Sequence, residues 1–232
     1  MSLSFKELKK NLKNDFSSLK KTKVALLADS ATQLYSQALR GYGFESGYNY
    51  ELFEADYDQI DRQVFDLSSE FYKSKSEFVI IFHSVQKLIK KFYLLTISEK
   101  KCFAEKHIDY VKSLCEAINS RQSSKIIYFN FAEMNDGVFG NYSNKIDSSF
   151  TFQVRKINYH LMLLSQEYKN LFINDLNTLQ SNYGNHFITE SKIWINTSIV
   201  FSLDFLPIIA KNTIIINVTF HPPSRNIASP SL

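Results

Sequence analysis

Residues 23–32, Lys-Val-Ala-Leu-Leu-Ala-Asp-Ser-Ala-Thr, decide the fold. The apolar run 24–28 shows no alternation of polar and apolar side chains, which is typical of a strand buried on both faces. Asp29 and Ser30 end this strand, and a helical pattern follows at once over 31–43. A buried strand that leads directly into a helix predicts a parallel sheet covered by helices.

The same pattern recurs along the chain. Further apolar runs predict strands near 48–54, 78–83, 125–131 and 171–175. Helical periodicity predicts one or two helices over 86–120 and another from Val154 to Tyr168. We therefore expect a three-layer α/β/α fold with a five-stranded parallel sheet in the order 2-1-3-4-5. The segment 214–220 is predicted as an additional edge strand.

Three regions are expected. Ser4 and Glu7 form a capping-box pattern, and apolar residues then repeat at helical spacing, so residues 1–22 are predicted to carry an amphipathic helix over 5–19. Residues 23–210 are predicted to form the α/β domain. Residues 211–232 are expected to be an irregular, poorly anchored tail, because the segment after Phe220 is rich in Pro and Ser and lacks periodicity.

Composition excludes several classes. The chain has 232 residues, 44% of them apolar, and a formal net charge of +4, which is too mild to favour nucleic acid. Neither a signal peptide nor an apolar run long enough to span a membrane occurs, so we expect a cytoplasmic protein without membrane partners. Cys102 and Cys115 lack metal or redox spacing and are expected to be reduced thiols.

Polar residues follow the predicted strands. In parallel sheets ligands bind at the carboxyl ends of the strands, which selects residues directly after the apolar runs. We predict that one cleft contains Asp29, Ser30, His83, Ser84, Asn130 and Asn141. Gln86 is a further candidate ligand-binding residue, and Asp175 follows the last strand.

The pair Asp29-Ser30 permits two interpretations. A serine hydroxyl between a strand end and a helix start has backbone N–H groups nearby, as an acyl-transfer nucleophile requires. Alternatively, Asp29 or Ser30 only caps the helix over 31–43. A second acidic pair, Asp56 and Asp58, is interpreted as a solvated loop, because an aliphatic strand does not precede it.

The segment Leu27-Ala28-Asp29-Ser30 resembles the Gly-Asp-Ser block of SGNH (GDSL-type) hydrolases, with Ala in place of Gly. Five segments together resemble the N-terminal SGNH-like domain of FkbH-like proteins. They start at Lys23, Phe53, Phe78, Asn130 and Phe201, and the resemblance covers about residues 5–210. It implies an SGNH/flavodoxin-like sheet.

The departures from the SGNH pattern concern catalysis. The block after the third strand reads His83-Ser84-Val85-Gln86, without the Gly and Asn of active esterases, and the late block 193–204 contains no histidine. Ser30 then lacks a base and is a poor nucleophile. His83 is the candidate substitute base, which makes Asp29, Ser30 and His83 the candidate catalytic residues.

The resemblance also implies a partner. FkbH-like proteins continue into a haloacid-dehalogenase-type (class IIIC) phosphatase domain, whose Asp-rich motif this sequence lacks. Mg²⁺ is expected only for that domain, so no cofactor is expected here. We expect a truncated or split N-terminal domain that works with a separate phosphatase domain or an acyl carrier protein. Related domains occur in polyketide and surface-polysaccharide biosynthesis.

Three functions remain open. The favoured one is a catalytically inactive SGNH-like binding or docking domain. The alternatives are an active esterase that uses Ser30 with a non-standard base, and a flavodoxin-like nucleotide binder. The last is disfavoured because the first loop lacks a Gly-rich phosphate nest.

Overall fold

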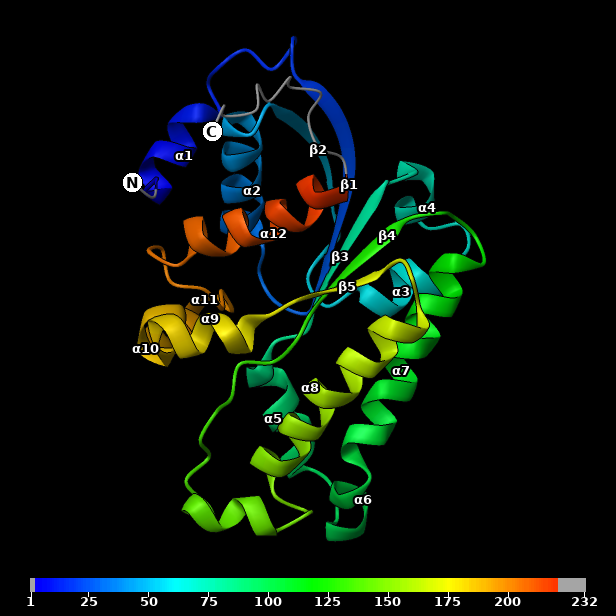
Figure 1. Ribbon diagram of the computed structural model, residues 1–232, viewed down its shortest axis with the longest axis vertical. Helices are drawn as coiled ribbons and strands as arrows, with labels where there is room; N and C mark the ends of the chain where they lie inside the picture. The colour runs from blue at the N-terminus through cyan, green and yellow to red at the C-terminus, as the bar shows by residue number, and fades with distance from the viewer. Residues whose placement is uncertain (1–2, 221–232) are drawn as a thin grey trace, which may run out of the picture.

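The computed structural model describes residues 3–220. Its five-stranded sheet is parallel throughout, has the order β2-β1-β3-β4-β5, and lies between two layers of helices (Figure 1). The strands are β1 (Lys20–Ala28), β2 (Tyr48–Glu54), β3 (Phe78–Phe82), β4 (Lys125–Phe129) and β5 (Leu171–Asn174). The predicted α/β/α class and strand order are confirmed.

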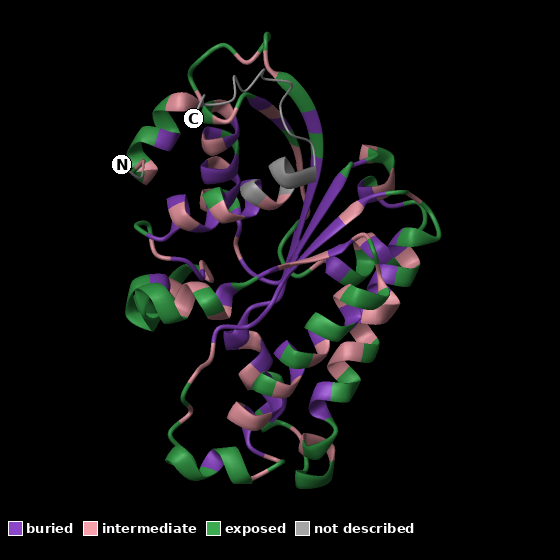
Figure 2. Ribbon diagram, in the orientation of Figure 1, coloured by how far each residue is buried: buried purple, intermediate pink, exposed green. Residues whose placement is uncertain are grey.

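Side chains of the central strands alternate between two cores. In β1, Val24 and Leu26 pack on one face of the sheet, whereas Ala25 and Leu27 pack on the other. We call the first the α2 face, covered by α1 (Phe5–Asn11), α2 (Gln33–Glu45) and α12 (Leu206–Phe220). The second, the α7 face, is covered by α3 (Ile60–Phe65), α4 (Glu70–Ser74), α5 (Val85–Tyr93), α7 (Phe103–Asn119) and α8 (Phe150–Glu167). The central strands are therefore buried on both sides, whereas the edge strands β2 and β5 are partly exposed (Figure 2).

The N-terminal helix is shorter than predicted. Helix α1 ends at Asn11 instead of residue 19, and β1 begins at Lys20 because Lys20 pairs with Tyr48 of β2. Between them, the carboxylate of Asp15 accepts hydrogen bonds from the backbone N–H and the hydroxyl of Ser17, both at 2.8 Å. Such a local side-chain turn competes with helical hydrogen bonding.

Helix α1 nevertheless packs on the body, as its apolar spacing predicts. Leu8 is fully buried against α2. Gly41 of α2 permits this approach, because a Cβ atom there would collide with the backbone carbonyl of Leu8.

The helical region predicted over 86–120 forms three helices, α5, α6 (Ile97–Lys101) and α7. Thr96 starts α6 with a capping box, in which its hydroxyl and Glu99 bond each other's backbone N–H groups. Farther along the chain follow η1 (Gly140–Lys145), α9 (Leu176–Tyr183), α10 (Asn185–Ile188) and α11 (Ser191–Thr197).

Two predictions for the C-terminal region are wrong. The segment 214–220 is the end of helix α12 and not an edge strand, and an irregular tail cannot begin at 211 because the helix continues to Phe220. Thr213 anchors it: the Tyr35 and Thr213 hydroxyls are 2.7 Å apart, and Asn174 Nδ2 donates to Thr213 Oγ1 at 2.7 Å. The part of the predicted tail after 220 lies outside the described residues.

Candidate functional site

The strand-end residues do not share one cleft, because strand alternation separates them. Asp29 follows β1 on the α7 face, where it lines a cavity of about 380 Å³ between α5 and α7. Ser30, the next residue, points to the α2 face and lines a much smaller pocket with Tyr35, Val200 and Phe201. Asp29 and Ser30 form a bend directly after β1, and their side chains continue the alternation of that strand, so these two neighbours belong to different cavities.

We call the larger space the α5–α7 cavity. It lies at the carboxyl edge of the sheet, where ligands bind in parallel α/β folds. The predicted site residues Asp29, His83 and Ser84 line it. Other lining residues come from helices, among them Asp61, Lys91, Phe103, Lys106, His107 and Tyr110.

A chain of hydrogen bonds runs below this cavity. The Tyr110 hydroxyl donates to Asp61 Oδ1 at 2.6 Å. Its oxygen then accepts from His83 Nε2 at 3.3 Å, and the Tyr128 hydroxyl donates to His83 Nδ1 at 2.9 Å. Tyr128 in turn accepts from His107 Nε2 at 3.0 Å. Because a neutral imidazole has one N–H, the carboxylate acceptor at one end fixes the direction of every bond.

Burial keeps both imidazoles neutral. The pKa of His83 lies well below 6.5, chiefly because the ring is buried, with smaller effects from His107, Lys91 and Lys87. Burial likewise lowers the pKa of His107 to about 3. His83 therefore carries no charge near pH 7, and its one basic nitrogen already accepts from Tyr128.

Asp29 is a buried carboxyl group with one strong partner. Only 4% of the residue is exposed, and its Oδ1 accepts the backbone N–H of Ser84 at 2.9 Å. Burial raises its pKa to about 6, although the bonds from Ser84 and the charge of Lys87 oppose this shift. Ser84 also begins α5, where its hydroxyl accepts the Lys87 N–H at 3.4 Å. Asp29 thus fixes the start of α5.

Ser30 is neither a helix cap nor part of a dyad with a base. The N-cap residue of α2 is Thr32, so the capping interpretation of Asp29 or Ser30 is wrong. The Ser30 hydroxyl is buried and has no hydrogen-bond partner among residues 3–220. The neighbouring N–H of Ala31 donates to the carbonyl of Ser198 at 3.0 Å, so this donor is already engaged.

The remaining predicted residues lie elsewhere. Asn130 Nδ2 donates to Asp175 Oδ1 at 2.7 Å, and Asp175 caps α9. Gln86 and Asn130 line a third, very small pocket together with His83, and within residues 3–220 Gln86 Oε1 is buried there without a partner. These residues connect helices to strand ends and do not reach Ser30.

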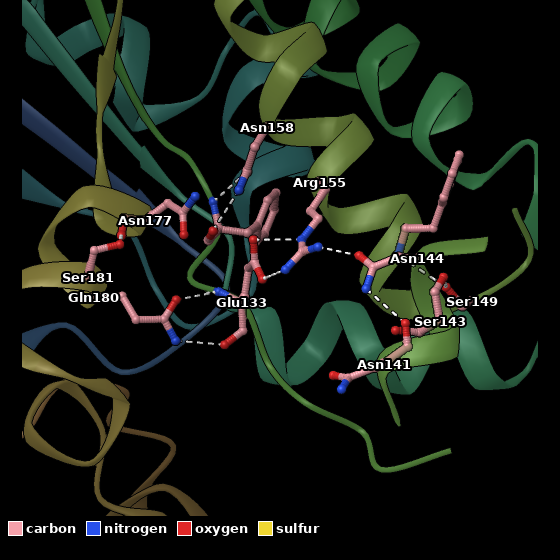
Figure 3. A network of polar contacts seen from close by, with 12 residues as sticks. Glu133, Asn141, Ser143, Asn144, Ser149, Arg155, Asn158, Asn177, Gln180 and Ser181 are labelled. Atoms are coloured by element: carbon pink, nitrogen blue, oxygen red, sulfur yellow. Dashed lines mark hydrogen bonds and ion pairs between the residues drawn. The ribbon is translucent and has the colours of Figure 1, made fainter. Parts of the chain in front are cut away.

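Asn141 does not belong to any of these pockets. It is exposed in η1, where its carbonyl accepts the Asn144 side chain at 3.0 Å. Arg155 of α8 also binds this region: its guanidinium group donates to both carboxylate oxygens of Glu133 and to the side-chain oxygen of Asn144 (Figure 3). The network around Asn141 holds the segment 133–149 on α8.

Sequence reasoning missed the helical half of the α5–α7 cavity. His107 and Tyr110 stand three residues apart on α7, next to the buried residues Val111 and Leu114. Polar rings at helical spacing beside an apolar stripe were the available signal. Lys91 and Lys106 gave no such signal, since lysines are common throughout the chain.

Residues 3–220 contain neither a cluster of metal-ligating side chains nor a membrane-spanning helix. Within this range, no group of three His, Cys, Asp or Glu side chains is suited to hold a metal ion. Likewise, none of the described helices is long and apolar enough to cross a membrane.

The fold and the strand-end residues define an α/β/α domain with an SGNH-like first block. The chain matches the family "FkbH, N-terminal domain" over residues 23–218 and belongs to that family. Its parallel sheet and helical layers agree with this assignment. No curated protein matches the chain.

One solved structure is similar over almost the whole chain. It is the N-terminal part of the protein BF1531 from Bacteroides fragilis, described as containing a phosphatase domain complexed with Mg. The two are 42% identical, with a TM-score of 0.90. The match covers 95% of this chain and 57% of that one, so this chain spans little more than half of that relative.

Two remote matches are enzymes. An acetyl xylan esterase, AlAXEase, is 14% identical, with a TM-score of 0.48 and coverage of 84% of this chain and 98% of that one. The C-terminal catalytic domain of peptidoglycan O-acetyltransferase A from Streptococcus pneumoniae is 12% identical, with a TM-score of 0.48 and coverage of 87% and 93%. Matches this remote say nothing about the activity of this chain.

Proposed function

We propose that this chain is a binding domain of an FkbH-type protein that does not hydrolyse esters by itself. The observation that carries the proposal is the separation of Ser30 from His83. Ser30 lies buried in a very small pocket on the α2 face, whereas His83 lines the α5–α7 cavity and uses both ring nitrogens in bonds to tyrosines. A serine nucleophile needs a base within hydrogen-bond reach, and none of the described residues bonds Ser30.

The surroundings of Ser30 support the same conclusion. An acyl-transfer site needs free N–H donors where the oxyanion develops. Here the Ala31 N–H is occupied by Ser198, and Val200 and Phe201, both 5% exposed, line the pocket beside the hydroxyl. An ester substrate would first have to displace this segment.

We further propose that the domain acts with a separate phosphatase domain or with an acyl carrier protein. The family assignment and the phosphatase domain of the Bacteroides fragilis relative support this proposal. The pathway class we propose is polyketide or surface-polysaccharide biosynthesis, in which the phosphatase domain, with Mg²⁺, would perform the phosphoryl chemistry.

Hydrolysis of p-nitrophenyl acetate tests the catalytic half of the proposal. We expect the same background rate from the wild type, Ser30→Ala and His83→Gln. Circular dichroism melts of each variant establish that it is folded. Wild-type turnover that Ser30→Ala abolishes would instead establish an active esterase with a non-standard base.

Titration calorimetry tests the partner half. We expect the chain to bind the separately produced phosphatase domain of the Bacteroides fragilis protein, and not a phosphatase domain of an unrelated family. Absence of heat with both domains and with an acyl carrier protein would contradict the docking role.

A further inference from the structure

Two of the lysines that line the α5–α7 cavity make no ion pair within residues 3–220. Three lysines line it, Lys87, Lys91 and Lys106. Lys87 is already engaged, because its Nζ lies 3.0 Å from Asp58 and 4.1 Å from the centre of the Tyr57 ring. Lys91 and Lys106 make no ion pair within residues 3–220. Two ammonium groups from different helices thus line one cavity without a direct ion pair in the described chain, although Glu99 is near enough to Lys106 to interact with it electrostatically.

The acids and histidines of the cavity do not neutralise these lysines. Asp29 is buried and accepts the N–H of Ser84, and Asp61 accepts the Tyr110 hydroxyl. His83 and His107 are neutral because burial lowers the pKa of each. Lys91 and Lys106 therefore present two ammonium groups to the cavity that no described carboxylate holds in an ion pair, and such a pair attracts an anion.

One wall of the cavity has a different character. Leu88, Leu95 and Phe103 line it, and Phe103 belongs to the hydrophobic core of the α7 face. The volume of about 380 Å³ lies near the lower end of the range of about 300–1,000 Å³ for small-molecule sites. The cavity therefore suits a small ligand with an apolar part.

We propose that the α5–α7 cavity binds a small amphipathic anion, whose carboxylate or phosphate group contacts Lys91 and Lys106 and whose short apolar chain contacts Leu88, Leu95 and Phe103. The proposal rests on the binding role proposed above and names its ligand class. Charge-assisted hydrogen bonds from the two lysines supply the recognition of the anion. The apolar wall selects against anions that lack a hydrocarbon chain.

Titration calorimetry with simple probes tests this ligand class. We expect hexanoate or hexyl phosphate to bind, acetate and inorganic phosphate to bind at least about tenfold more weakly, and hexanol not to bind. The stronger of the two six-carbon anions identifies the headgroup. Failure of both to bind, or equal binding of hexanol, would overturn the proposal.

Two variants locate the site. The double substitution Lys91→Gln with Lys106→Gln is expected to weaken binding of the better probe by at least about tenfold. Lys90→Gln removes the same charge from α5 outside the cavity and is expected to leave binding unchanged. Equal affinities of wild type and double variant would contradict the assignment. The proposed function is tested separately by hydrolysis of p-nitrophenyl acetate, which does not use these probes. Turnover in that assay would refute the proposed function without bearing on ligand binding in the cavity.

Discussion

Asp29 and Ser30 are adjacent in the sequence, yet their side chains line different pockets on opposite faces of the sheet. The Asp29 carboxylate accepts the backbone N–H of Ser84 at the start of α5, whereas the buried Ser30 hydroxyl bonds nothing in the part of the chain that the structure describes. The sequence thus contains a block that resembles the Gly-Asp-Ser block of SGNH hydrolases, but the backbone directs its Asp and Ser side chains to opposite faces of the sheet. Several measurable consequences arise from this division.

Ser30→Ala is expected to leave the free energy of unfolding unchanged or to raise it by up to about 1 kcal/mol, because it removes a buried hydroxyl that lacks a hydrogen bond. Urea unfolding measures this change. Ser84→Ala is the matched control, since it removes the N-cap of α5 and should cost about 1 kcal/mol. A comparable loss for Ser30→Ala would mean that the hydroxyl has a partner.

Asp29→Asn is expected to change how stability depends on pH. Burial raises the pKa of Asp29 to about 6 from 3.8, so the folded protein holds this proton more tightly than the unfolded chain. Asp29 therefore lowers stability progressively as the pH rises from about 4 to about 6, by about 2 kcal/mol. The difference in unfolding free energy between variant and wild type should grow over this window. A constant difference would exclude the raised pKa.

His107→Gln is expected to reduce the loss of stability in acid. Burial lowers the pKa of His107 to about 3. Below pH 6.5 this imidazole therefore becomes protonated in the unfolded chain while it stays neutral in the folded protein. The folded state consequently loses about 2 kcal/mol between pH 7 and pH 5 through this one residue. Unfolding curves at both pH values measure it. His160→Gln, on a different helix, is the control and should retain the wild-type loss.

Tyr128→Phe is expected to destabilise the protein by about 2–3 kcal/mol. Its fully buried hydroxyl donates to His83 and accepts from His107, so its removal leaves His83 Nδ1 and His107 Nε2 without their partner. Thermal or urea unfolding measures the effect. Tyr142→Phe removes an exposed hydroxyl and should change stability little. Equal effects of the two substitutions would refute the hydrogen-bond chain.

Arg155→Gln is expected to accelerate proteolysis within 133–149 while lowering global stability by less than about 1 kcal/mol, as is usual for exposed ion pairs. Arg155 joins α8 to Glu133 and Asn144, which hold this segment (Figure 3). Limited proteolysis with mass spectrometry locates the cuts. Lys112→Gln breaks the Lys112–Glu167 pair outside the segment and should not alter the cutting pattern.

The sequence by itself determined the sheet. The apolar runs of the central strands lack alternation because these strands are buried on both faces. All five strands lie where they were predicted, and their order agrees with the expected 2-1-3-4-5. The sequence also placed Asp29, His83 and Ser84 at adjacent strand ends, and all three line the α5–α7 cavity. These features are local, since each depends only on what a short segment must bury.

Only the tertiary structure decided the face to which each strand-end residue points and the identity of ambiguous segments. The segment 214–220 is apolar at nearly every position, so its periodicity did not distinguish helix from strand, and the packing of α12 against α2 and β5 settled the question. Likewise, α7 brings His107, Tyr110 and Lys106 to the ends of strands that are distant in sequence. The alternation of extended backbone then directs Asp29 toward these residues and Ser30 away from them, because consecutive side chains cannot occupy the same face of a sheet.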